Sequence, residues 1–155
     1  MASRNAGPTL AKVNGVSAGL SGVAIARMLK TGALYFSLVF GAGFILGPIR
    51  LFWVVPRFGT RMAELLESPI MFAVMVAAAW WVVRRCRVPV TASIRLGMGL
   101  VALGLMLIAE FGFMLWLRGM SFAQYLATRD PVSGTVYYIM LGTMAMLPLF
   151  VSRRH

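Results

Sequence analysis

The chain has 155 residues, of which 60% are hydrophobic and only 12% are charged, whereas a soluble domain is about 45–50% apolar and about 25% charged. This balance predicts an integral membrane protein. Lysine and arginine outnumber aspartate and glutamate by 15 to 4, but no stretch alternates basic and aromatic residues in a polar setting, so we attribute the excess to membrane orientation signals and predict no nucleic-acid partner.

Residues 1–30 precede the first strongly apolar run. The stretch VNGVSAGLSGVAIARML, residues 13–29, contains three glycines, two serines and an asparagine, which makes it a weak membrane span. We expect a cytoplasmic N-terminal tail that is either an amphipathic helix at the interface or loosely ordered. A cleaved signal peptide is not expected, because the apolar run after Lys30 is long and no small-residue cleavage pattern follows it.

Four apolar runs approach the roughly 20 residues that a helix needs to cross a bilayer. They cover residues 31–55, 62–83, 96–117 and 132–151, the second being a shorter apolar run lengthened upstream by RMAELLE. The predicted fold class is therefore all-α. We expect a polytopic membrane protein whose four-helix transmembrane domain, residues 31–151, is an up-down-up-down bundle with short loops, followed by a cytoplasmic tail at 152–155.

Helix-breaking residues stand between the first two spans. Pro48 and Pro56 predict a kink, and Gly59 predicts a tight turn after it. Thr60 is a candidate N-cap for the second helix. The first two spans are therefore predicted to form a helical hairpin.

Small residues recur on the first three spans. Gly43 and Gly47 form a GxxxG pattern, Ala73 and Ala77 provide a small face on the second span, and Gly97 and Gly99 provide one on the third. Such faces allow close helix approach, and we expect packing within the chain rather than dimerisation.

The segment before the last span carries helix start signals. Ser121 and Gln124 are spaced as a capping box, which predicts a short amphipathic helix over SFAQYLATR, residues 121–129. Asp130 followed by Pro131 is typical of the start of the last span.

Basic residues predict the orientation. Ten of them fall on one predicted side and four on the other, so the positive-inside rule favours cytoplasmic N- and C-termini. Tryptophan agrees with this topology, because all four tryptophans fall at predicted span ends, as interfacial anchors do. They are Trp53, Trp80, Trp81 and Trp116.

Two charged residues fall inside predicted spans. At 1.5 Å per residue, Arg50 lies roughly 8 Å and Glu110 roughly 10 Å below the outer boundary. Charges in a membrane usually face the bundle and pair. We therefore predict an intramembrane ion pair between Arg50 and Glu110.

Further charges are expected at the same end of the bundle, where they would form one polar cluster. Its predicted members are Arg50, Arg57, Arg61, Glu64, Glu67 and Glu110. The cluster has three interpretations: it holds the helices in register, it binds a headgroup, ion or small polar solute, or Glu110 acts as a buried acid or base. Tyr137 or Tyr138 can donate a hydrogen bond to it, although an interfacial role suits these tyrosines better.

Ligands for metal and redox chemistry are scarce. Cys86 is the only cysteine and His155 the only histidine, which excludes an intrachain disulfide, a CxxC pair, a zinc–cysteine site and a haem held by two histidines. Histidine-based triads are excluded for the same reason. The methionines are spread over all spans and are interpreted as packing. We expect no metal, no cofactor and no enzymatic activity.

The run GAGFILGPIRLFWVVPRFGTRMAELLESPIM, with the later AEFGF and RDPVSG, resembles small four-span bacterial inner-membrane proteins of unknown function. The resemblance covers residues 31–151. It implies a bacterial cytoplasmic membrane and no particular activity.

Two hypotheses for the function follow. The first is a non-enzymatic membrane protein, namely an accessory or assembly subunit or a protein that binds lipid, another membrane protein or itself. The alternative is a small oligomeric transporter or channel that uses Glu110 and Arg50 as a solute or proton site.

Overall fold

The backbone of residues 7–119 and 131–151 is described by a computed structural model. Within these two ranges every regular element is a helix, which confirms the all-α prediction. The elements are α1 (Gly7–Ile49), the π-helix η1 (Arg50–Val54), α2 (Val55–Arg85), α3 (Ala92–Arg118) and α5 (Pro131–Phe150). The short helix predicted over residues 121–129 lies outside the described residues.

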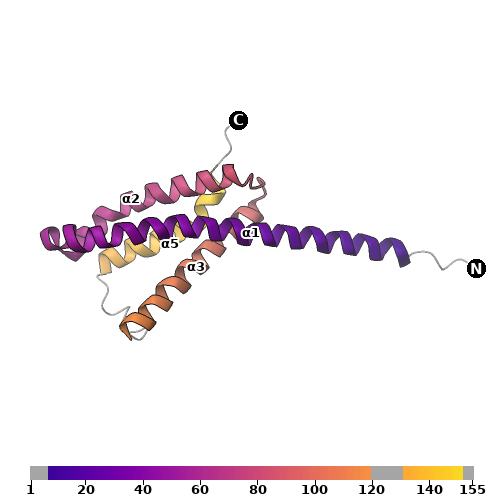
Figure 1. The fold of residues 1–155 in the computed structure, drawn as a ribbon. Helices are drawn as coiled ribbons and strands as arrows, with labels where there is room; N and C mark the ends of the chain where they lie inside the picture. Colours follow the sequence, from indigo (N-terminus) through magenta and orange to yellow (C-terminus); the bar gives the residue numbers. More distant parts are fainter. Residues whose placement is uncertain (1–6, 120–130, 152–155) are drawn as a thin grey trace, which may run out of the picture.

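Helix α1 is longer than the predicted first span. It begins at Gly7 and runs without interruption past Lys30. The predicted N-terminal tail and the first predicted span are therefore parts of one continuous helix, with no break at residue 30. The only proline before Pro48 is Pro8, which lies in the first turn, where proline is tolerated. Figure 1 shows the first part of α1 extending beyond the other helices.

The chain turns back on itself after α1, as the prolines and Gly59 predict. Pro56 has no backbone N–H to donate, and just before it the helix widens into η1, where the Val55 N–H reaches the Arg50 carbonyl. Gly59 then adopts φ 77° and ψ 164°, a conformation that is essentially restricted to glycine. Beyond this turn, α2 lies beside α1 and runs in the opposite direction (Figure 1).

The four long helices surround a common interior. Helix α1 packs against α2 and α3, and α5 packs against the same two helices, so the order around the bundle is α1, α2, α5, α3. Successive helices alternate in direction (Figure 1). Gly119 ends α3 in a left-handed conformation with φ 58°, and α5 begins at Pro131, as predicted.

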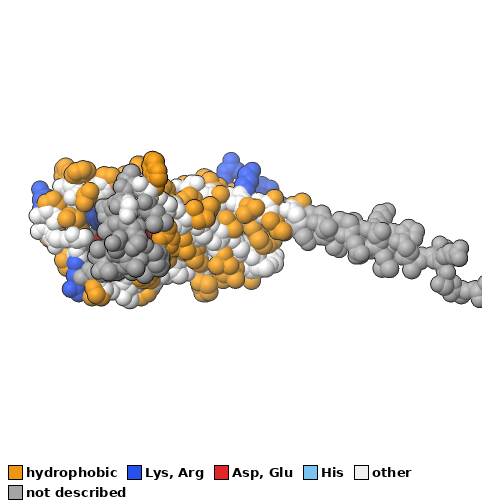
Figure 2. All heavy atoms as spheres, turned by 90° about the horizontal axis from the view of Figure 1, so that it is seen from below, with side chains coloured by type: hydrophobic (Ala, Val, Ile, Leu, Met, Phe, Trp, Pro, Cys, Tyr) orange, Lys and Arg blue, Asp and Glu red, His pale blue; other side chains and the backbone are white. Residues whose placement is uncertain are grey.

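Three helical stretches are long and apolar enough to cross a membrane: Gly22–Arg85, which contains the turn at Gly59, then Ala92–Gly112 and Pro131–Phe150. Large apolar side chains such as Phe44, Phe52 and Ile108 are exposed on the outside. Figure 2 shows hydrophobic side chains over the bundle surface and lysine or arginine side chains toward its ends. A soluble monomer rarely exposes so much contiguous apolar surface. These features are those of a membrane protein.

The helix faces that meet differ from the predicted ones. Ala73 and Ala77 are exposed. The buried stripe of α2 instead contains Met75, Ala79 and Val82, which follow the spacing of one helix face. The predicted small-residue face of α2 is therefore wrong by about half a helix turn and points away from the neighbouring helices.

Close backbone approach occurs at Gly99, one of the small residues predicted to pack on the third span, and not at Gly43 or Gly47. A Cβ added at Gly47 meets no atom within 4 Å, and one at Gly43 meets only the Met71 methyl at 3.6 Å. At Gly99 on α3, by contrast, an added Cβ would collide with the backbone of Ala145 on α5. Close backbone approach at a glycine thus joins α3 to α5, and the GxxxG of α1 has no such contact.

Candidate functional site

A pocket of about 410 Å³ lies between the four helices, within the range of about 300–1,000 Å³ that is typical of small-molecule sites. All four helices and η1 contribute to its wall. Its lining comprises Val39, Phe40, Gly43, Phe44, Gly47, Arg50, Glu64, Glu67, Ser68, Met71, Met75, Met106, Ala109, Glu110, Ser133, Tyr137, Met140, Leu141 and Met144. The pocket therefore combines a mostly apolar wall with four ionisable carboxylate or guanidinium groups.

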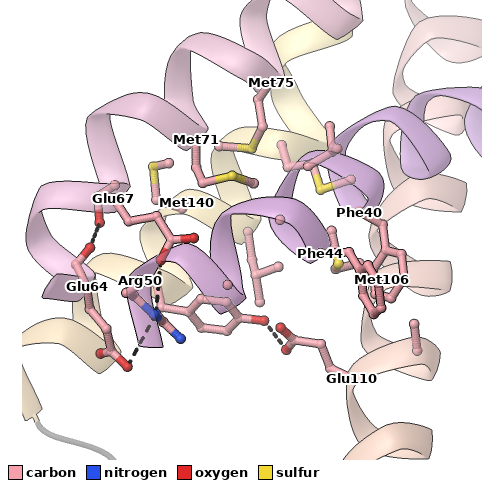
Figure 3. A pocket seen from close by; sticks show the side chains of 18 of the residues that line it. Phe40, Phe44, Arg50, Glu64, Glu67, Met71, Met75, Met106, Glu110 and Met140 are labelled. Atoms are coloured by element: carbon pink, nitrogen blue, oxygen red, sulfur yellow. Dashed lines mark hydrogen bonds and ion pairs between the residues drawn. The ribbon is translucent and has the colours of Figure 1, made fainter. Parts of the chain in front are cut away.

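One guanidinium and two carboxylates form the polar end of the pocket on the hairpin side. Arg50 Nη1 lies 3.0 Å from Glu67 Oε2 and 3.7 Å from Glu64 Oε1. Glu64 and Glu67 are three residues apart on α2 and therefore share a face. Figure 3 shows both glutamates reaching toward Arg50. All three side chains are partly buried, with 34%, 24% and 16% exposure for Arg50, Glu64 and Glu67.

A second polar contact joins the other two helices. The Tyr137 hydroxyl on α5 donates a hydrogen bond to the Glu110 carboxylate on α3. Both residues also line the pocket, and Figure 3 shows Glu110 on the far side of it from Glu64 and Glu67. Tyr137 therefore makes a hydrogen bond to Glu110, one of the two roles considered for the paired tyrosines, rather than having the interfacial role that the sequence favoured.

The ion pair of Arg50 differs from the predicted one. Among the described residues, its carboxylate partners are Glu64 and Glu67 rather than Glu110. Arg50 and Glu110 do line the same pocket, as their similar depth suggests. The hairpin, however, brings α2 directly against the end of α1, so the two glutamates of α2 are the nearer partners.

Arg57 and Arg61 are not brought into the pocket. Both are exposed, and neither contributes to its wall. Four of the six predicted cluster members therefore meet around one cavity, and the remaining two lie on the surface near the hairpin turn.

Methionine and phenylalanine make up much of the apolar wall, whereas the sequence pattern indicates only packing for the methionines. Met71 and Met75 on α2, and Met140 and Met144 on α5, are pairs at i, i+4 spacing that face the pocket together with Met106. Phe40 and Phe44 form a similar pair on α1, with ring centroids 6.4 Å apart. The i, i+4 spacing of these pairs can be seen in the sequence. In a helix that is apolar all round, however, such spacing does not show whether a face lines a pocket or contacts lipid.

The side chains available for covalent or metal chemistry are few. In the part of the chain that the structure describes, no three His, Cys, Asp or Glu residues come together to hold a metal ion. The Ser68 hydroxyl, a pocket-lining group, donates to the Glu64 backbone carbonyl at 2.9 Å. The arrangement suits binding by charge, aromatic faces and apolar contact.

The predicted tryptophan anchors lie on the outer surface. Trp53, Trp80, Trp81 and Trp116 are all exposed, as a contact with lipid headgroups requires. The Arg84 guanidinium stacks over the Trp80 ring at 4.2 Å from its centroid. This pair lies near the end of α2, away from the hairpin turn.

Arg95 is a buried arginine near the start of α3, at the end of the bundle opposite the hairpin turn. Arg95 is only 3% exposed. Its Nη1 donates to the Val151 carbonyl at 2.6 Å, and its Nε donates to the Pro89 carbonyl at 3.2 Å. Arg95 thereby ties the start of α3 and the preceding loop to the end of α5.

No protein-family model, curated protein or solved structure matches this chain.

Proposed function

We propose that this chain is a four-span, non-enzymatic protein of the cytoplasmic membrane that binds an amphipathic, lipid-like molecule in the pocket between its helices. Such a protein would serve as an accessory or lipid-binding component of the membrane. The observation that carries the proposal is the pocket itself, because it joins a polar end containing Arg50 and Glu67 to an apolar wall. Amphipathic ligands need both kinds of surface.

The count of four spans rests on the hairpin. The stretch Gly22–Arg85 is 64 residues long, whereas a span needs only about 20. It also reverses direction near Gly59, where α2 turns back along α1. Two crossings within this stretch, together with α3 and α5, give four. The ten-to-four distribution of basic residues supports cytoplasmic termini.

The transporter hypothesis uses the same pocket. It also requires a polar route through the other half of the bundle, but the ionisable lining residues gather toward the hairpin end, where Arg50, Glu64 and Glu67 lie. That distribution favours binding over passage.

The test is to purify the protein in a mild detergent and identify retained molecules by mass spectrometry, comparing two substitutions on α1. Gly47→Leu projects a side chain into the pocket, since Gly47 lines it and an added Cβ meets no atom within 4 Å. Gly41→Leu is the matched control, because it is equally unobstructed but does not line the pocket. We expect a retained amphiphile that Gly47→Leu removes and Gly41→Leu leaves.

Two results would contradict the proposal. One is that both variants retain the same molecules as the unchanged protein. The other is that the purified protein moves protons or solute across liposomes and stops doing so when Glu110 is changed to Gln, which would establish the transporter instead.

A further inference from the structure

We propose that the pocket selects amphiphiles with a cationic head, such as a quaternary or protonated amine on an apolar body. The inference rests on the proposed function and deepens it by assigning the charge of the ligand. Three features of the pocket carry it: the balance of charge around Arg50, the aromatic pair on α1 and the methionine wall.

The charge balance around Arg50 is negative. Its single guanidinium is shared by two carboxylates, Glu67 at 3.0 Å and Glu64 at 3.7 Å. Among the described residues that line this part of the pocket, two carboxylates thus stand beside one guanidinium. Inside a membrane bundle, where the effective dielectric constant is low, such an excess attracts a positive ligand more strongly than in water.

Aromatic rings stand across the pocket from these carboxylates. Phe40 and Phe44 both line it, with Phe44 also largely exposed on the outside, and their rings stack with centroids 6.4 Å apart. The face of an aromatic ring attracts a cation. Figure 3 places the two rings and the Arg50–glutamate group on different sides of one cavity, so a ligand in it can meet both.

The methionines complete a surface that suits bulky apolar groups. Met71, Met75, Met106, Met140 and Met144 all line the pocket. Methionine side chains are flexible and polarizable, and they adapt to ligands of varied shape. An apolar body attached to the cationic head would pack against this wall.

An anionic head fits these observations poorly. A phosphate would have to displace Glu64 and Glu67 from Arg50, the only lysine or arginine among the described residues that line the pocket. A small hydrated metal ion fits no better, because most of the wall is apolar and cannot replace its water ligands.

Two ions of similar size and shape but opposite charge provide the test: tetraphenylphosphonium and tetraphenylborate. Their binding to the full-length protein in an uncharged detergent is measured by equilibrium dialysis. We expect the phosphonium to bind at least roughly tenfold more tightly, a difference of about 1.4 kcal/mol. Glu67→Gln should weaken phosphonium binding while bringing the two affinities closer together.

Control variants separate charge from shape and from loss of fold. Gly47→Leu should reduce binding of both ions, because it fills the pocket. Arg57→Gln, at an exposed position outside the pocket, should leave the ratio of the two affinities unchanged. If Glu67→Gln lowers the melting temperature too far for measurement, Glu64→Gln tests the same charge balance.

The outcomes distinguish the two proposals. Equal or tighter binding of tetraphenylborate overturns the cation inference, and if Gly47→Leu still blocks that binding, the amphiphile-binding function stands. If neither ion binds but a neutral lipid is retained and lost on Gly47→Leu, the cation inference again fails alone. If Gly47→Leu and Gly41→Leu behave identically toward every probe, both proposals fail.

Discussion

Arg50 stabilises the end of the hairpin by lying between two like charges. Glu64 and Glu67 are three residues apart on α2, a spacing at which two carboxylates repel each other. The Arg50 guanidinium offsets that repulsion and links η1 to α2. Because none of the three side chains is fully exposed, removing one partner costs more than the loss of a surface salt bridge, which is about 0–1 kcal/mol.

Changing Arg50 to Met should lower the thermal stability of the purified protein more than Glu64→Gln does. The substitution leaves two facing carboxylates without their cation. We expect a cost of about 1–3 kcal/mol, below the about 3–5 kcal/mol of a fully buried pair, because the Arg50 side chain keeps some contact with solvent. Adding Glu67→Gln to Arg50→Met should restore part of the loss. An unchanged melting temperature for Arg50→Met would show that the ion pairs do not stabilise the fold.

Arg95→Met should also destabilise the protein, through lost hydrogen bonds rather than through charge repulsion. The carbonyls of Pro89 and Val151 would lose a buried donor, at a cost of about 1–3 kcal/mol. Arg85→Met provides the control, because Arg85 is exposed at the same end of the bundle. Thermal unfolding in detergent compares the two. Equal melting temperatures would mean that the Arg95 hydrogen bonds contribute nothing to stability.

At the scale of the helices, apolar length predicted the membrane-crossing stretches but not the start of α1 at Gly7, whereas Gly59 predicted the turn and Pro131 the start of α5. The faces that meet could not be predicted in the same way, because lipid and helix interior are both apolar and a hydrophobic helix surface does not show which one it contacts. Ala73 and Ala77 were misplaced for this reason. The position of a residue along its helix predicted that Arg50 and Glu110 lie at similar depth, and both do line one pocket. It did not predict which way each side chain faces around the helix axis, and that direction determines which carboxylates pair with Arg50.

Gly99→Ala should separate α3 from α5 locally. The added methyl would meet the Ala145 backbone, which cannot move aside as a flexible side chain does. Overpacking of this kind costs about 1–3 kcal/mol. Gly104→Ala on the same helix is the control, since an added Cβ there meets no atom within 4 Å, and it should be neutral or stabilise the helix by up to about 1 kcal/mol. The prediction fails if both variants unfold at the same temperature.

Considered as a whole, the molecule is an apolar body with basic residues at both ends (Figure 2). The end of α2, the start of α3 and the end of α5 lie together, opposite the hairpin turn (Figure 1). The end of the bundle opposite the hairpin turn contains Arg84, Arg85, Arg87 and Arg95. The hairpin end contains Arg57 and Arg61, accompanied by Glu64 and Glu67. The positive-inside rule predicts that the end with four arginines faces the cytoplasm, in line with the orientation that we propose.

Cys86 makes this orientation testable without a fusion partner. It is the only cysteine of the chain and lies directly after α2, partly exposed, at the end that we assign to the cytoplasm. A membrane-impermeant maleimide should therefore label the protein only after cells are permeabilised. In a Cys86→Ser background, Arg57→Cys places a thiol at an exposed position beside the hairpin turn, and it should react in intact cells. If Cys86 is labelled in intact cells and the Arg57→Cys thiol is protected, the orientation is the reverse of the proposed one. The hairpin end, where Arg50 and Glu67 lie, would then be the cytoplasmic end of the bundle.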